Sequence, residues 1–146
     1  MSYNILNIIG DMSVYEFFLI TTLSLIRNYN LLIFFIIGFL LNCILNNISV
    51  YIFKNYVNQF GLIDPSGHFQ TFAFCYIFYI LSHKKINPYI FFLLLFIALC
   101  CVMNCTIFNY HTQFEIILGT IFGMLFSYFY FINIKPFVAP FVQNPI

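Results

Sequence analysis

Long apolar stretches separated by short polar interruptions run through almost the whole chain. The apolar stretches predict helices over residues 14–26, 31–53, 65–81, 88–103 and 112–132. The interruptions predict turns at 28–30 and 82–87, a loop over 55–64 and a connector over 104–110. Ser13 and Glu16 have the spacing of a capping box, which predicts that the first helix starts there. Residues 1–12 are mixed in character, and the proline-containing tail from Asn133 is expected to be irregular.

The composition indicates the solvent around these helices. Hydrophobic residues make up 63% of the 146 residues and charged residues only 6%, whereas soluble domains carry about 25% charged residues. Such a chain cannot cover a water-facing surface. We therefore expect an all-α integral membrane protein, with residues 1–146 forming a single domain built as a bundle of four or five transmembrane helices. The helix over 14–26 is shorter than the roughly 20 residues of a typical span. Whether it spans the membrane or lies at the interface is therefore left open.

The few charges predict the orientation of the bundle and exclude one class of partner. The helix ends near Lys54 and His111 fall on one side, whereas four of the five cations fall on the other: Arg27, Lys84, Lys85 and Lys135. The positive-inside rule then places His68 and His111 on the lumenal or exterior face.

A net charge of +1 without a basic run argues against nucleic acid as a partner.

Polar chemistry gathers at two segments, each at the start of an apolar helix. In the first, Asp64–His68, Pro65 suits the first turn of a helix. The free backbone N–H groups and the positive end of the helix dipole there can bind an anion. Gly67 lets a ligand approach the backbone, Ser66 adds a hydroxyl donor, and His68 adds an acid–base group.

The second segment, residues 109–115, carries a histidine and a carboxylate on one helix face. His111 and Glu115 are four residues apart, so the carboxylate could hold the imidazole in one tautomer and raise its basicity. Small residues continue this face at four-residue intervals: Gly119, Gly123 and Ser127. A glycine pair at this spacing allows close helix approach, so the stripe is expected to face the bundle. We predict that His68 and His111 meet at one end, within about 10 Å.

Other polar and sulfur-containing residues lie inside the apolar stretches. Polar residues in such positions usually face the bundle, and the stretch 31–53 holds three: Asn42, Asn46 and Asn47. Asn47 and Lys54 are seven residues apart, so both are expected to point to the same place.

The five cysteines lack paired metal spacing and are interpreted as small core residues: Cys43, Cys75, Cys100, Cys101 and Cys105. Zinc bound by the two histidines with Cys105 or Glu115 is an alternative that the spacing does not favour.

The two polar segments resemble the signatures of a known family. Pro65-Ser66-Gly67-His68, followed by Phe69-Gln70, is similar to the second signature of the type 2 phosphatidic acid phosphatase (PAP2) superfamily. Tyr110-His111-Thr112, with a polar residue at 115 and Gly119, resembles the third signature, especially in the dolichyl-diphosphatase branch. Residues 52–59, with Lys54, resemble the start of the first signature. The resemblance covers about residues 38–123, most of the chain.

The sequence also departs from the family pattern at its arginines. The first signature ends in Arg-Pro, where this chain has Gly61-Leu62. The third has Ser-Arg, where this chain has Asn104-Cys105. The acid after the third-signature histidine is usually Asp, or Gln in the dolichyl branch, and here it is Glu115. Two phosphate-clamping arginines are therefore absent, which predicts weak turnover.

The resemblance implies a metal-independent lipid phosphatase without a cofactor. His111 would be the nucleophile that becomes a phosphohistidine, Glu115 would orient it, and His68 would protonate the leaving oxygen. Three further residues would hold the phosphoryl oxygens: Lys54, Ser66 and Gly67. The substrate would be a lipid phosphomonoester or a polyprenyl or dolichyl diphosphate. The site would face the lumen of the endoplasmic reticulum or another endomembrane.

A second reading belongs to a different functional class. A chain that kept the PAP2-like fold and lost catalysis would act as a lipid-binding or structural scaffold in the membrane. Positive charge discriminates the two, because each lost transition-state donor can cost about 10²–10³ in rate. On the histidine side only Lys54 and the histidines themselves remain.

Overall fold

The computed structural model describes residues 5–57, 64–83, 87–107 and 111–138, and among them it leaves out the side chains of 5–13, 57, 104–107 and 138. Every regular element in this part of the chain is helical. The elements are α1 (Ile5–Leu25), α2 (Tyr29–Ile52), the π-helical turn η1 (Phe53–Val57), α3 (Gly67–Ser82), α4 (Pro88–Ile107) and α5 (Gln113–Val138). The expected all-α class is confirmed for the described residues.

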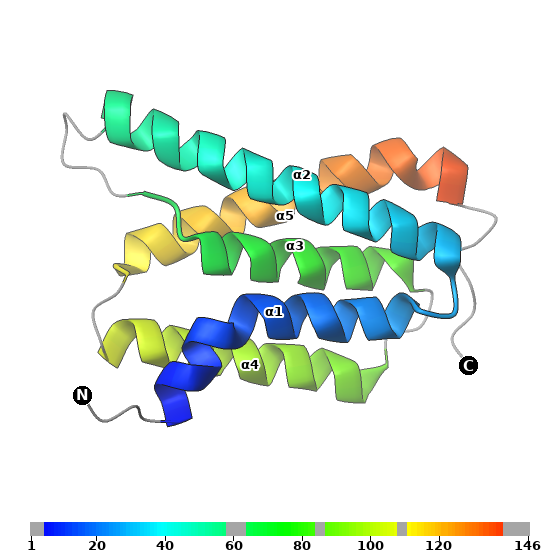
Figure 1. Cartoon of the computed structure of the whole chain (residues 1–146), viewed down its shortest axis with the longest axis horizontal. Coiled ribbons are helices and arrows are strands. Elements are labelled where there is room, and N and C mark those ends of the chain that lie inside the picture. The colour runs from blue at the N-terminus through cyan, green and yellow to red at the C-terminus, as the bar shows by residue number, and fades with distance from the viewer. Residues whose placement is uncertain (1–4, 58–63, 84–86, 108–110, 139–146) are drawn as a thin grey trace.

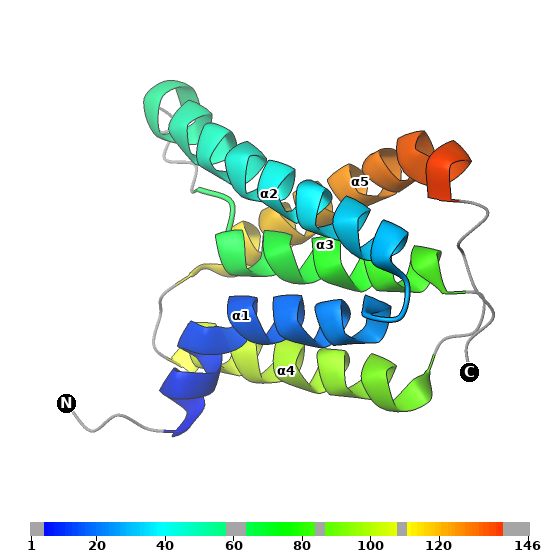
Figure 2. The ribbon, with the colours of Figure 1, turned by 45° about the vertical axis from the view of Figure 1, so that its right-hand side comes forward.

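Helix α3 is the centre of the bundle. It packs against α5, α1 and α2 and touches α4, and Figures 1 and 2 show it between α2 and α5 on one side and α1 on the other. Nine of its 16 residues are buried. The end of α2 and the starts of α3 and α5 lie at the same end of the bundle in Figure 1. The two polar segments are therefore brought to one end.

Two predicted helix boundaries in the first half of the chain, at Ser13 and at residue 55, are wrong. Ser13 lies inside α1, which already begins at Ile5. Capping-box spacing is thus not sufficient for a helix start when the preceding residues can continue the helix. The true cap of the next helix is Asn28, whose Oδ1 accepts the N–H of Leu31 at 3.2 Å. The predicted loop over 55–64 also begins later, because η1 extends the helix to Val57 and carries Lys54.

Both C-terminal helices run further than predicted. Helix α4 continues through residues 104–107, which were expected to be a connector. Helix α5 continues through Pro136 to Val138, where an irregular tail was expected. A proline in the final turn removes one hydrogen bond near an end that frays in any case, so it does not break the helix. The rest of the predicted tail, 139–146, lies outside the described residues.

Helices α3 and α5 are parallel and pack with their backbones in close contact. A methyl group added at Gly119 would overlap the carbonyl oxygen of Ser66, and one added at Gly123 would overlap that of Gln70. One register further on, the Ser127 hydroxyl donates to the Phe74 carbonyl at 3.0 Å. The predicted small-residue stripe on α5 therefore faces the bundle, as expected, and its partner is α3.

Helices α2 and α3 pack antiparallel along a stripe of small and polar residues on α2. Gly38 contacts the Phe74 ring and Asn46 contacts Gly67. Between them, the Gln70 Nε2 donates to the carbonyl and to the Oδ1 of Asn42, at 3.3 and 3.2 Å. Asn47 is exposed, so the expectation that it faces the bundle is wrong. Four-residue spacing selects Asn42 and Asn46 instead.

Aromatic rings and cysteines fill the rest of the interior. The Phe35 ring lies 5.2 Å from that of Phe78 and 5.9 Å from that of Phe74, measured between centroids. Such pairs stabilise a core beyond the area they bury. Three of the cysteines predicted to be core residues are buried and a fourth, Cys43, is half-buried. The side chain of Cys105 lies outside the described part of the chain.

The outer helices present apolar side chains to the surroundings. Large hydrophobic residues are exposed on α1, α2, α4 and α5, whereas α3, all of whose residues are described, exposes none. Among the residues that the structure describes, two helices are long and apolar enough to cross a membrane, Tyr29–Tyr56 and Gln113–Phe137. Val14–Leu25 and Pro88–Met103 are shorter apolar helices. These features are compatible with a membrane protein. The count of four or five spans stays a prediction.

Candidate active site

The start of α3 leaves polar groups without partners. Ser66 is the N-cap residue in an extended conformation, yet its side chain makes no capping hydrogen bond. The residue is fully buried, and its Oγ has no hydrogen-bond partner. An N-cap hydroxyl normally accepts a backbone N–H of the first turn. The first turn of α3 therefore keeps a dipole end and a hydroxyl that the protein itself does not use.

The start of α5 is closed by a capping box. The Glu115 Oε2 accepts the N–H of Thr112 at 2.6 Å and the Thr112 hydroxyl at 3.3 Å. In return, the Thr112 Oγ1 accepts the N–H of Glu115 at 3.4 Å. The sequence Thr-x-x-Glu forms this reciprocal pair because both side chains reach the opposite backbone N–H. Glu115 thus stabilises the helix start whatever its role in chemistry.

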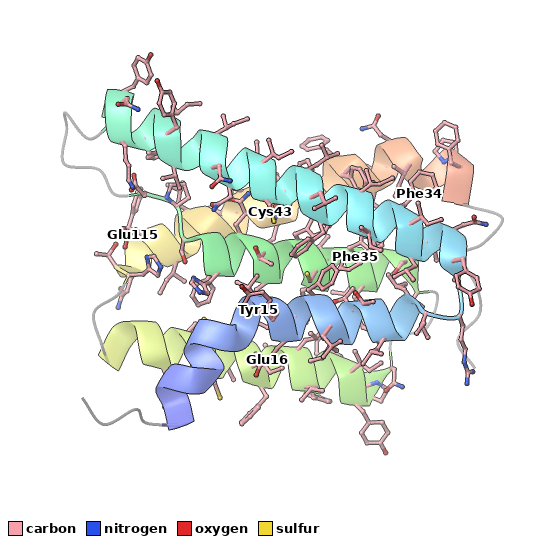
Figure 3. All side chains as sticks on the ribbon, viewed as in Figure 1. Tyr15, Glu16, Phe34, Phe35, Cys43 and Glu115 are labelled. Carbon is pink, nitrogen blue, oxygen red and sulfur yellow. The ribbon has the colours of Figure 1, made fainter. Side chains whose placement is uncertain are left out.

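The two histidines face each other across these helix starts. The centroids of the His68 and His111 rings are 6.2 Å apart, which confirms that they meet at one end. The His111 Nδ1 lies 3.4 Å from the Glu115 Oε2, a close contact without hydrogen-bond geometry. Figure 3 shows Glu115 at the end of the bundle where α3 begins.

A backbone hydrogen bond fixes the two helix starts to each other. The N–H of Ser66 donates to the carbonyl of Glu115 at 3.0 Å. Gly119, one turn further along α5, lies against the same serine. These contacts fix the two helix starts relative to each other, and each histidine lies within four residues of this junction.

Lys54 reaches this end through Asp64. Its Nζ lies 3.7 Å from the Asp64 Oδ2, and the two side chains are 60% and 25% exposed. The other carboxylate oxygen of Asp64 is buried and has no hydrogen-bond partner. Lys54 was expected to bind a phosphoryl group, and in the structure it pairs with this carboxylate two residues before Ser66.

Positive charge is scarce around the site. Among the described residues, Arg27 follows α1 and Lys135 lies in the last turn of α5, both at the opposite end of the bundle. Gly61 and the side chain of Cys105 lie outside the part of the chain that the structure describes. Within the described residues, no three His, Cys, Asp or Glu side chains are grouped as metal ligands.

Three features of this end were missed in the sequence. The capping role of Glu115 could have been found from the spacing of Thr112 and Glu115, the same spacing that was assigned at Ser13. Asn46 was expected to face the bundle, but its contact with the start of α3 was not predicted, although its four-residue spacing to Asn42 indicates the same face. The pairing of Lys54 with Asp64 could not be predicted from spacing, because it depends on the path that the residues between them take.

Comparison with known proteins gives one family. No curated protein and no solved structure matches the chain significantly. The sequence model of the PAP2 superfamily matches residues 39–138, well over half of the chain. The match contains both histidines, the serine-glycine start of α3 and the glycine stripe of α5. This protein therefore belongs to the PAP2 superfamily.

Proposed function

We propose that the protein is a multi-pass membrane phosphatase that hydrolyses a lipid phosphate through a phosphohistidine intermediate. Family membership suggests a phosphatase-like function. The observation that carries the proposal is the 6.2 Å separation of the His68 and His111 rings at the joined helix starts. At that separation, one phosphoryl group lying beside both rings can be reached by one imidazole as nucleophile and by the other as acid.

In the first step, the Nε2 of His111 attacks phosphorus. The P–O bond to the lipid breaks, and the leaving oxygen takes a proton from His68. Glu115 faces the Nδ1 of His111 and stabilises the positive charge that develops on the ring. In the second step, His68 removes a proton from water, the hydroxide attacks phosphorus, and the P–N bond breaks to release inorganic phosphate.

The phosphoryl oxygens bind at the start of α3. The Ser66 hydroxyl, which has no partner in the protein, donates to one oxygen, and the N–H of Gly67 donates to another. Anions bind readily at such helix starts. Lys54 contributes charge once the phosphoryl group competes with Asp64 for it. An ion pair this exposed contributes little free energy, so the exchange is easy.

The apolar surroundings favour a lipid-anchored substrate. The site lies at one end of a bundle whose outer helices expose hydrophobic side chains, so an acyl or polyprenyl chain can lie along them while the headgroup enters the site. A phosphatidic acid or a polyprenyl or dolichyl diphosphate fits this description. We place the site on the lumenal face of the endoplasmic reticulum or another endomembrane, from the cation bias of the sequence.

Phosphate release by the purified full-length protein tests the proposal. The assay is run with a chelator present, on phosphatidic acid and on a polyprenyl diphosphate, with His111→Ala as the matched control. We expect slow, chelator-resistant release by the wild type and none by the variant. Release that does not exceed the His111→Ala background on either lipid would refute the enzyme and favour the catalytically impaired scaffold.

A further inference from the structure

Buried polar atoms without partners continue from the start of α3 onto α2. Besides the Ser66 Oγ, the Asn46 Oδ1, the Asn42 Nδ2 and the Gln70 Oε1 are buried and have no hydrogen-bond partner. Ser66, Asn42 and Gln70 are fully buried as whole residues. Native proteins leave few such atoms, and a group of them indicates a missing ligand or water.

Asn46 is the member of this group that reaches the start of α3. A methyl group at Gly67 would lie 2.7 Å from the Asn46 Nδ2, with the rest of the amide at 3.4 and 3.5 Å. The amide therefore covers the first residue of α3, on the side facing α2. One turn further along α2, Asn42 is held by its hydrogen bonds from Gln70, which fixes the register that brings Asn46 there.

We propose that Asn46 is a further residue that positions the phosphoryl group, contributed by α2 to the anion site at Ser66 and Gly67. The inference rests on the proposed function and adds a phosphate-binding residue to it. An amide donates to P–O⁻ through its NH₂ and accepts from P–OH through its oxygen. It therefore suits a phosphoryl group in either protonation state. A neutral amide also supplies a donor at an end of the bundle where the described cations are few.

Matched variants of two adjacent asparagines test the role. Asn46→Ala removes the amide, and Asn47→Ala makes the same change at the exposed neighbour. KM and kcat for lipid turnover are measured on the full-length protein. Inhibition of turnover by inorganic phosphate, and the rise in unfolding temperature that inorganic phosphate causes, are measured as well. We expect Asn46→Ala to weaken phosphate binding and raise KM by about 10-fold to 100-fold, the range for a hydrogen bond to a charged group, with a smaller change in kcat. Asn47→Ala should stay within about twofold of the wild type, since surface changes have small effects.

Asn46→Asp keeps the shape of the side chain, so it tests the same residue if the alanine variant fails to fold. Its negative charge should weaken phosphate binding at least as much. Equal phosphate affinity and KM in the Asn46 and Asn47 variants would overturn the inference while leaving the phosphatase intact. If the wild type binds phosphate but turns over no lipid, and Asn46→Ala loses that binding, the inference stands and the enzyme fails. A wild type that neither binds phosphate nor turns over lipid overturns both.

Discussion

Two helices start side by side in this protein, each with a histidine, and only one of the starts is closed. At α5, Thr112 and Glu115 use each other's side chains to satisfy the backbone. At α3, Ser66 is in the capping position but caps nothing, and its hydroxyl is buried without a partner. A helix start that is already satisfied has little left to offer a ligand, whereas an open one keeps donors available. In the proposed mechanism, the phosphoryl group therefore binds at the start of α3 and the nucleophile His111 lies at the start of α5.

The largest expected effect on turnover comes from substitution of the two histidines, which should differ in their consequences. His111→Ala should abolish turnover, because no second nucleophile is proposed at this end. His68→Ala should slow it by about 10²–10⁴, the usual contribution of a positioned acid, while His111 can still be phosphorylated. Brief reaction with a ³²P-labelled lipid phosphate, followed by alkaline denaturation, should reveal labelled His68→Ala protein and no labelled His111→Ala protein. Label on the His111→Ala protein would contradict the assignment of the nucleophile.

The contrast between open and closed starts predicts opposite outcomes for two hydroxyl residues. Ser66→Ala should lower kcat by about 10²–10³, because it removes a transition-state donor, and should leave the unfolding temperature almost unchanged. Thr112→Ala should lower stability by about 1 kcal/mol, the cost of a lost cap, and change kcat much less. Both are measured by thermal unfolding and phosphate release. If Ser66→Ala proves to be the destabilising change and Thr112→Ala the inactivating one, the comparison is wrong.

Glu115 belongs to both the cap and the chemistry, and two substitutions separate these roles. Glutamine can replace glutamate in a capping box, so Glu115→Gln should keep the unfolding temperature. It should lower kcat about tenfold, which corresponds to roughly 1.4 kcal/mol of lost charge stabilisation at His111. Glu115→Ala should lose both the activity and about 1 kcal/mol of stability. Equal activity in the wild type and the glutamine variant would reduce Glu115 to a structural cap.

The smallest expected effect concerns the ion pair beside the open start. Asp64→Asn releases Lys54 and removes a negative charge near the phosphoryl group, so KM should fall. An exposed ion pair contributes about 0–1 kcal/mol, which limits the fall to about fivefold. The difference from the wild type should shrink as salt screens the charges. A rise in KM on this substitution would instead make Asp64 a part of substrate binding.

The sequence was sufficient for features that depend on local spacing. The central helix was predicted at 65–81 and lies at Gly67–Ser82, because proline and glycine mark its start and polar residues its end. The meeting of His68 and His111 followed from the i+4 stripe, since small residues allow only one face of α5 to approach a neighbour so closely. Features set by competition between helices could not be predicted in this way. Whether Asn46 or Asn47 faces the bundle depends on the rotation of α2 against α3. The pairing of Lys54 with Asp64 depends on the path of the chain between the end of α2 and the start of α3.

The parallel arrangement of α3 and α5 has a consequence for the helix between them. Ser127 and Phe74 are 53 residues apart in sequence, and each glycine of the α5 stripe meets α3 at the same offset. Two parallel neighbours require the intervening chain to travel back the full length of the bundle, and α4 is that return path. Its 20 residues span about 30 Å at roughly 1.5 Å per residue. One added turn in α4 would move the start of α5 by about 5.4 Å, against a register that the glycine contacts hold in place. The position of the two histidines therefore depends on the length of α4, because that length sets where α5 begins.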